Sequence, residues 1–181
     1  MQEDLVLCEA PSHLFKTAGF AHQFLQGVQF IHDQLVAHLD LKPNNIVIRA
    51  SGKLYIIDFS VSVRVPRLDS RLTGYQGTRG WVAPEVEWDP DAGYWPILAD
   101  LWSTGKVLRY LADRQDTYCC EMQSLADRLQ SPEPQQRPLL STINLDTSHP
   151  LSKSKRKLSP DAQTRGEVKR KCVEEAEKRA G

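Results

Sequence analysis

The chain has 181 residues, 40% of them hydrophobic, and its 23 Lys and Arg balance its 23 Asp and Glu. This size suits one domain with a tail, and the zero net charge excludes a protein that is strongly basic or acidic overall. No stretch approaches the roughly 20 apolar residues of a membrane span, and we expect neither a membrane nor a nucleic acid as partner.

The cysteines and the first thirty residues indicate an intracellular protein. Cys8, Cys119, Cys120 and Cys172 form no CxxC pair, and two of them are adjacent, which suits neither a routine disulfide nor a zinc site. Residues 1–30 contain no continuous apolar run of signal-peptide length. We therefore expect all four thiols to be reduced.

Hydrophobic periodicity predicts a helix in the first part of the chain. Apolar residues recur at intervals of four, four, three and four, which places them on one face of an amphipathic helix over about residues 17–34. These residues are Phe20, Phe24, Val28, Ile31 and Leu35. Next, the β-rich runs at 46–48 and 54–57 flank Ala50-Ser51-Gly52, which predicts a hairpin.

The second half of the chain predicts a long loop and two more helices. The loop runs from residue 60 to about residue 85 and contains Pro, Gly and Arg. The apolar pattern of residues 97–111 indicates a largely buried helix, and residues 121–129 indicate another. The expected fold class is mainly α with a small β-hairpin.

Charge and composition separate a basic tail from the rest of the chain. Residues 1–150 hold 13 Lys and Arg against 18 Asp and Glu, whereas residues 151–181 hold 10 against 5. We predict a folded domain at 1–146 and a disordered tail at 147–181, with at most a short helix at 167–180. The tail's basic clusters suit either a solubilising role or a nuclear-import or anion-binding role, so a cytoplasmic location, a nuclear location or both are expected.

Five motifs occur in a fixed order along the predicted domain. They are HLDLKPNN at residues 38–45, DFS at 58–60, GT at 77–78, APE at 83–85 and DLWSTG at 100–105. Together they resemble the catalytic loop, metal-binding turn, activation-segment end and central-helix start of the protein kinase family. The resemblance covers about residues 5–140, and the Lys-Pro pair in the first motif resembles the serine/threonine class, in a fungal-like form.

The resemblance implies roles for four polar residues. Phosphoryl transfer needs a hydroxyl held in line with the γ-phosphate, cations and a nearby base. Asp40 is the implied base, and Lys42 would reach the γ-phosphate of ATP. Asn45 and Asp58 would bind Mg²⁺. The predicted hairpin between them returns the chain and so brings these two ligands together. The implied cofactors are ATP and Mg²⁺, and the implied partner is a protein substrate or another protein.

Five other residues match positions that support the site. We interpret His38 as a packing residue bonded to backbone and Asp100 as an acceptor of backbone N–H groups near the catalytic loop. Glu85 and Arg137 are expected to form a buried ion pair. Thr78 either contacts Asp40 and the substrate backbone or caps the loop.

The sequence also departs from the family pattern. The residues ahead of His38 contain no G-x-G-x-x-G and no Val-Ala-x-Lys, so the resemblance implies the C-terminal lobe of an α+β kinase fold with a truncated N-terminal lobe. Leu39 stands where many kinases have Arg, which makes control by activation-loop phosphorylation less expected. Ser60 replaces Gly at the metal turn, and the stretch between Asp100 and Arg137 is short.

Three functions compete at this point. The first is a serine/threonine kinase in a truncated or weakly active form. The second is a pseudokinase-like interaction module, in which Asp40 and Asp58 survive as scaffolds. The third, a small-molecule phosphotransferase, is disfavoured because such enzymes often lack an APE segment of this kind.

Overall fold

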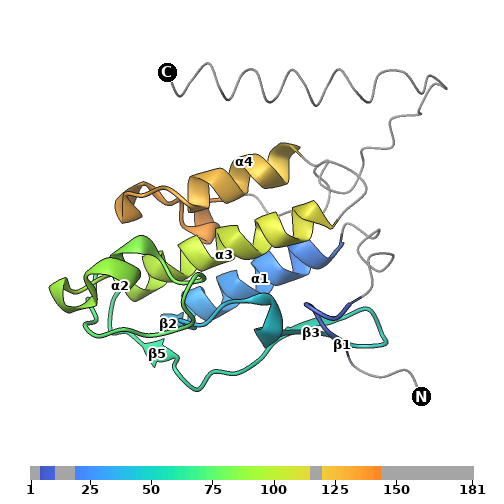
Figure 1. Ribbon diagram of the computed structural model, residues 1–181, viewed down its shortest axis with the longest axis horizontal. Helices are drawn as coiled ribbons and strands as arrows, with labels where there is room; N and C mark the ends of the chain where they lie inside the picture. The colour runs from blue at the N-terminus through green and yellow to red at the C-terminus, as the bar shows by residue number, and fades with distance from the viewer. Residues whose placement is uncertain (1–4, 11–18, 115–119, 144–181) are drawn as a thin grey trace.

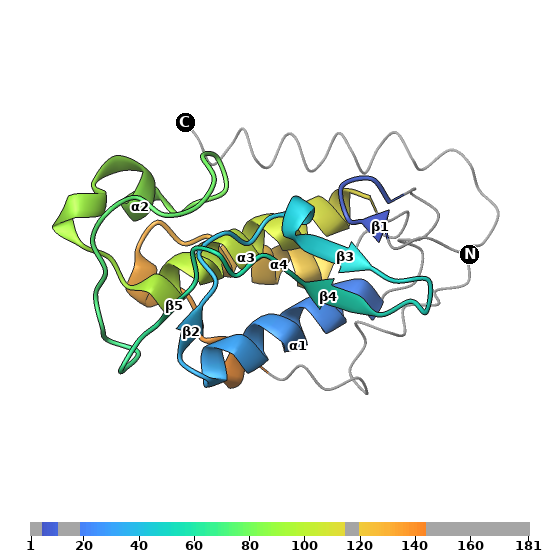
Figure 2. The ribbon, with the colours of Figure 1, turned by 90° about the horizontal axis from the view of Figure 1, so that it is seen from below.

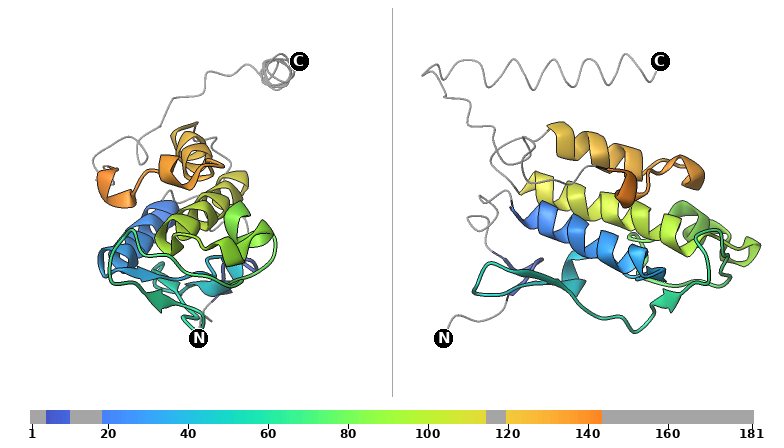
Figure 3. Two further views of the ribbon diagram at one scale, coloured as in Figure 1. Left: turned by 90° about the vertical axis from the view of Figure 1, so that its left-hand side faces the viewer. Right: turned by 180° about the vertical axis from the view of Figure 1, so that it is seen from behind.

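Three helices form the body of the protein, and the computed structural model describes residues 5–10, 19–114 and 120–143 of it. In Figure 1, α1 (Gly19–Asp33) lies beside α3 (Pro96–Asp113), and α4 (Cys120–Leu129) lies across α3 on its other side. A short helix, α2 (Pro84–Trp88), lies at one end of this body. Figure 3 shows the strands on the side of α1 and α3 that faces away from α4.

Two small antiparallel sheets complete the fold. One has the order β1-β3-β4, formed by Leu5–Val6, Ile46–Ile48 and Leu54–Ile56. The other pairs β2 (Val36–Ala37) with β5 (Val63–Arg64). Figure 2 shows β3 and β4 lying along α1 and the β2–β5 pair near its C-terminal end. The predicted hairpin is confirmed, but it belongs to a three-stranded sheet, and the second sheet was not predicted.

The first helix forms because its apolar residues repeat at the helical period. Phe20, Phe24 and Val28 are buried against the core, whereas Phe30 points outward and is exposed. The helix ends at Asp33, and Leu35 then adopts a left-handed backbone with φ of 58°. The predicted helix over 17–34 is therefore confirmed from Gly19 to Asp33, and its first two positions lie outside the described residues.

The central helix α3 is buried along much of its length. Pro96 opens it at a position where the missing N–H is not needed. Its contact with α4 is close at Gly105, where an added Cβ would lie 2.7 Å from Cγ of Gln130 and 2.9 Å from the carbonyl oxygen of Ala126. The predicted helices at 97–111 and 121–129 are both confirmed, the first with three further residues and the second with one.

The long loop between β4 and α2 is anchored to the start of α3. Leu72 and Tyr94 form an isolated β-bridge, and the buried Tyr94 hydroxyl donates to the carbonyl of Gly74 at 3.2 Å. Burial raises the pKa of Tyr94 to about 12, so this hydroxyl keeps its proton at neutral pH. The predicted loop is therefore held in place and also contains the short strand β5.

No helix in the described ranges is long and apolar enough to cross a membrane. The predicted domain boundary at residue 146 and the tail at 147–181 lie outside the described residues. They stay predictions.

Gly105→Ala is expected to destabilise the protein. Alanine favours helices by about 1 kcal/mol over glycine, but overpacking against α4 typically costs about 1–3 kcal/mol. Because the added Cβ would meet the Ala126 backbone, which cannot move aside easily, we expect the cost to exceed the gain, with a net loss of up to about 2 kcal/mol in the free energy of unfolding, measured in urea. Gly19→Ala is the control, since its nearest neighbour is 3.7 Å away, and it should leave stability unchanged or slightly raised. Equal stability of Gly105→Ala and the original chain would contradict this packing.

Candidate active site

A buried carboxylate holds the loop that carries Asp40. Asp100, on α3, is 1% exposed, and it accepts the backbone N–H of His38 at 2.5 Å and that of Leu39 at 2.7 Å. Leu39 has a left-handed φ of 66°, which is unfavourable for a side chain of this kind. His32 Nε2 lies 3.2 Å from the same carboxylate, and the Thr104 hydroxyl donates to the Asp100 carbonyl. Asp100 therefore fixes a strained turn one residue before Asp40.

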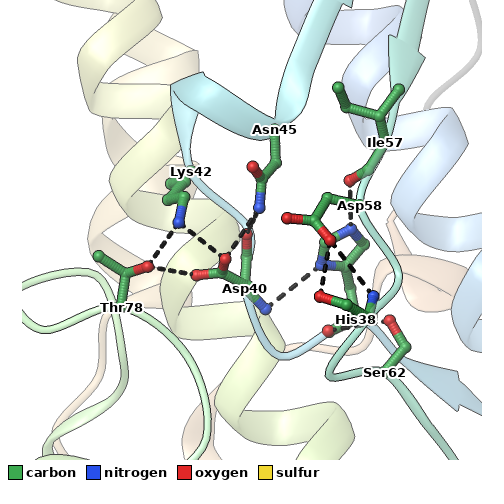
Figure 4. Close-up of polar contacts among 9 residues, drawn as sticks. His38, Asp40, Lys42, Asn45, Ile57, Asp58, Ser62 and Thr78 are labelled. Atoms are coloured by element: carbon green, nitrogen blue, oxygen red, sulfur yellow. Dashed lines mark hydrogen bonds and ion pairs between the residues drawn. The ribbon is translucent and has the colours of Figure 1, made fainter.

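Asp40 lies at the centre of a hydrogen-bonded cluster (Figure 4). Lys42 Nζ donates to Asp40 Oδ2 at 2.8 Å and to Thr78 Oγ1 at 2.6 Å, and Thr78 Oγ1 donates to Asp40 Oδ1 at 2.6 Å. Asn45 Nδ2 donates to the Asp40 carbonyl at 2.8 Å and to Oδ2 at 2.9 Å. Lys42, Thr78 and Asn45, all predicted site residues, thus converge on Asp40. The ammonium group of Lys42 balances the charge of the Asp40 carboxylate.

His38 links this loop to the segment that follows β4. Its Nε2 lies 3.0 Å from the carbonyl oxygen of Ile57, and its Nδ1 accepts the backbone N–H of Asp40 at 3.2 Å. These partners require a neutral ring with its proton on Nε2. The ring also packs on Phe59, with 4.7 Å between centroids, and Ser62 donates to the His38 carbonyl. This is the environment of a packing residue and not of a group that exchanges protons with substrate.

Asp58 comes directly after Ile57, whose backbone is bonded to the loop that carries Asp40 and Asn45. The Ile57 N–H donates to the Asn45 carbonyl at 2.9 Å, and Asp58 itself has a φ of 63°. Its Oδ1 accepts the Ser60 hydroxyl at 2.7 Å and the Ser60 N–H at 3.4 Å. The Ser60 hydroxyl bond, followed by its N–H bond, lowers the pKa of Asp58. The Ser that departs from the family pattern therefore favours the ionised form of this exposed carboxylate and holds its side chain.

Asn45 and Asp58 carry side-chain oxygens of the kind that a magnesium ion shared with phosphate would need. Both Asn45 amide bonds above come from Nδ2, and no donor among the described residues bonds its Oδ1, which leaves this oxygen for a cation. No group of three or more His, Cys, Asp or Glu in the described ranges could hold a metal by itself. Mg²⁺ typically takes one or two protein oxygens and completes its shell with phosphate and water, so this donor set suits it.

The activation-segment end is tied to the last part of the domain. Arg137 donates from Nη1 to Glu85 Oε1 at 2.6 Å and from Nη2 to Oε2 at 2.8 Å. The same buried guanidinium donates to the carbonyls of Leu98 and Ser131 and lies over the Trp102 ring. A bidentate pair of this kind fixes direction as well as distance. It holds α2 against α3.

One residue of this arrangement, His32, was not predicted from the sequence, and for Gly77 the motif was predicted but not the reason for the glycine. His32 is a polar residue on the buried face of α1, and that position was the signal that could have found it. Gly77 has a φ of 105°, and a Cβ there would collide with the Leu39 carbonyl and approach Val82. Only glycine lets the chain pass so close to the catalytic loop and deliver Thr78 to Asp40.

Asp100→Ala is expected to cost about 3 kcal/mol of unfolding free energy, because it leaves two buried N–H groups without their charged acceptor. Urea unfolding would measure the loss. The matched control is Asp69→Ala, which removes an exposed carboxylate paired with Arg67 and should change stability by under about 0.5 kcal/mol. Similar stabilities for the two variants would show that the Asp100 bonds do not hold the loop.

Comparison with known proteins agrees with this geometry. The protein kinase domain family model matches residues 9–177. The chain is 44% identical over 101 residues to the probable serine/threonine-protein kinase KKQ8 of Candida glabrata, across 54% of this chain and 13% of that protein. It is 40% identical over 102 residues to the serine/threonine-protein kinase HAL5 of Saccharomyces cerevisiae, across 54% and 12%. A mouse Nik-related protein kinase is 32% identical over 105 residues, across 56% and 7%.

The chain therefore spans only a small part of the length of these curated relatives. The family match, in contrast, runs through most of the 181 residues. Since its catalytic-loop, metal-turn and APE motifs all fall within the matched range, the chain belongs to the protein kinase domain family.

Proposed function

We propose that this chain carries the catalytic part of a serine/threonine protein kinase, which transfers the γ-phosphate of ATP to protein hydroxyls. The observation that carries the proposal is the convergence of Lys42, Thr78 and Asn45 on the Asp40 carboxylate. Relatives that bear the name serine/threonine-protein kinase support the substrate class, as does the Lys42-Pro43 pair.

In this proposal, Asp40 orients the substrate hydroxyl and accepts its proton. Its Oδ1 is bonded to the Thr78 hydroxyl, which is the contact that a substrate hydroxyl would share or exchange. Lys42 already lies 2.8 Å from Asp40 Oδ2, so its charge is placed where negative charge from a phosphoryl group would approach. Asn45 holds the Asp40 carboxylate through its amide and keeps it from turning away.

The same proposal assigns Asn45 and Asp58 to Mg²⁺. The ion, when bound, would neutralise charge on the phosphate oxygens. The Ser60 hydroxyl bond lowers the pKa of Asp58 below its ordinary value, which favours the carboxylate form that an ion ligand requires. Ser60 orients this side chain through its hydroxyl.

We further propose that the described residues are the C-terminal lobe of the kinase fold and that the 181 residues act weakly on their own. The printed sequence contains no G-x-G-x-x-G, the segment that covers the ATP phosphates in the family. Phosphoryl transfer depends heavily on positioning, so a site without that cover is expected to be slow.

A second candidate function is a pseudokinase-like module that binds another protein. One observation favours it: Tyr55, Ile57 and Phe59, at alternate positions beside Asp58, are 40%, 40% and 46% exposed. A row of exposed apolar side chains is a common feature of interaction surfaces.

The location of the protein also stays a proposal. The basic clusters at 153–157 and 169–171 lie outside the described residues. We propose a cytoplasmic or nuclear location, or both. Imaging of a tagged chain with and without residues 147–181 tests whether the tail directs nuclear entry.

Calorimetry of Mg²⁺·ATP binding to the purified chain separates the two functions. We expect weak binding that is detectable at millimolar ATP, since no G-x-G-x-x-G covers the phosphates, and that weakens at least about tenfold in Asp58→Ala, because the ion loses its charged ligand. Asp69→Ala, another exposed aspartate of the same segment, is the control and should bind as the original chain does.

Absence of binding at millimolar ATP would contradict the kinase proposal for this chain and favour the interaction module. Binding that survives unchanged in Asp58→Ala would contradict the metal assignment.

A further inference from the structure

An exposed arginine follows directly after the residue that contacts Asp40. Thr78 Oγ1 lies 2.6 Å from both Asp40 Oδ1 and Lys42 Nζ, and Arg79 is the next residue along the chain. Consecutive Cα atoms are about 3.8 Å apart, so the Arg79 backbone lies directly beside Thr78, the residue that contacts Asp40. The Arg79 side chain is 90% exposed and accessible to such a peptide.

The contacts of Arg79 leave most of its guanidinium free for a ligand. Arg79 Nε donates to Glu87 Oε1 at 3.1 Å. Within the described part of the chain, its two terminal nitrogens make no hydrogen bond. A guanidinium can bind a carboxylate or a phosphate through two parallel donors, so these nitrogens suit an anion.

Glu87 is less accessible than its partner. Its side chain is 23% exposed, and its second oxygen, Oε2, accepts the Tyr75 hydroxyl at 3.2 Å. Both carboxylate oxygens are therefore engaged by groups of the same chain. Arg79 is therefore the more accessible member of the pair, while the Asp40 charge is balanced by Lys42. Apart from Asp58, the exposed carboxylate that the proposed function assigns to Mg²⁺, the exposed charge next to Thr78 is that of Arg79.

We propose that Arg79 selects substrates with a negatively charged side chain, a carboxylate or a phosphate, next to the acceptor hydroxyl. This inference rests on the proposed kinase function and adds to it the class of substrate. An arginine at an exposed position gives a modest preference, because solvent and salt screen its charge.

Peptide binding to the full 181-residue chain tests the inference without requiring turnover. Four fluorescent nonapeptides share a central Ser and differ in the two flanking residues, which are Glu, phosphoserine, Ala or Lys. Anisotropy titrations at low salt should show the Glu or phosphoserine peptide, or both, binding roughly fivefold more tightly than the Ala peptide, and the Lys peptide binding most weakly. Which anion binds better distinguishes carboxylate from phosphate recognition.

Three variants assign the effect to its residue. Arg79→Glu should reverse the order of the Glu and Lys peptides. Glu87→Gln should make the Glu peptide bind more tightly still, since the substitution removes the competing carboxylate and retains the shape of the side chain. Arg67→Glu is the matched control, because Arg67 is 77% exposed and also pairs with one acid, Asp69, so the order should stay as in the original chain.

Equal affinities for the four peptides, the same order in Arg79→Glu, or no binding at millimolar peptide would overturn the inference. The Mg²⁺·ATP measurement reports separately on the kinase function. Nucleotide binding without peptide ranking refutes only the role of Arg79, whereas peptide ranking without nucleotide binding supports Arg79 as a docking residue and refutes only the kinase proposal.

Discussion

The site depends on one buried carboxylate that reaches from the central helix to the backbone of the catalytic loop. Asp100 binds two successive N–H groups, of which the second belongs to Leu39 in its left-handed conformation. Such a conformation persists only where surrounding contacts determine it. Because Asp100 lies on a buried helix, the position of Asp40 follows from the packing of the core and not from the loop alone.

Electrostatic balance is the second constraint on this site. A carboxylate that lost its partners in a half-buried position would carry a large desolvation penalty. Asp40 avoids it by binding Lys42 from its own loop and Thr78 from a segment 38 residues later. Lys42 balances the charge of Asp40, so exposed charges nearby, such as Asp58 and Arg79, have more influence on what approaches.

The activation segment is held at both of its ends by contacts that differ in kind. Near its start, Ser62 donates to the His38 carbonyl and joins the segment to the catalytic loop. Near its end, Arg137 donates two charge-assisted hydrogen bonds to the Glu85 carboxylate. Between these ends, Gly77 passes against Leu39 where no other residue fits. The site is thereby assembled from segments that are far apart in sequence.

The sequence by itself determined the three longer helices α1, α3 and α4, the hairpin and the set of polar residues, because each depends on local periodicity or on residues close together in the chain. The short helix α2 was not predicted. The sequence did not predict β1, β2 or β5, since strands of two residues are too short to show an alternating pattern. Only the tertiary structure decided that His32 and Asp100 meet, 68 residues apart, and that Thr78 lies between Asp40 and Lys42. These contacts arise from the packing of α1 on α3 and from the path of the activation segment, which no single stretch of sequence encodes.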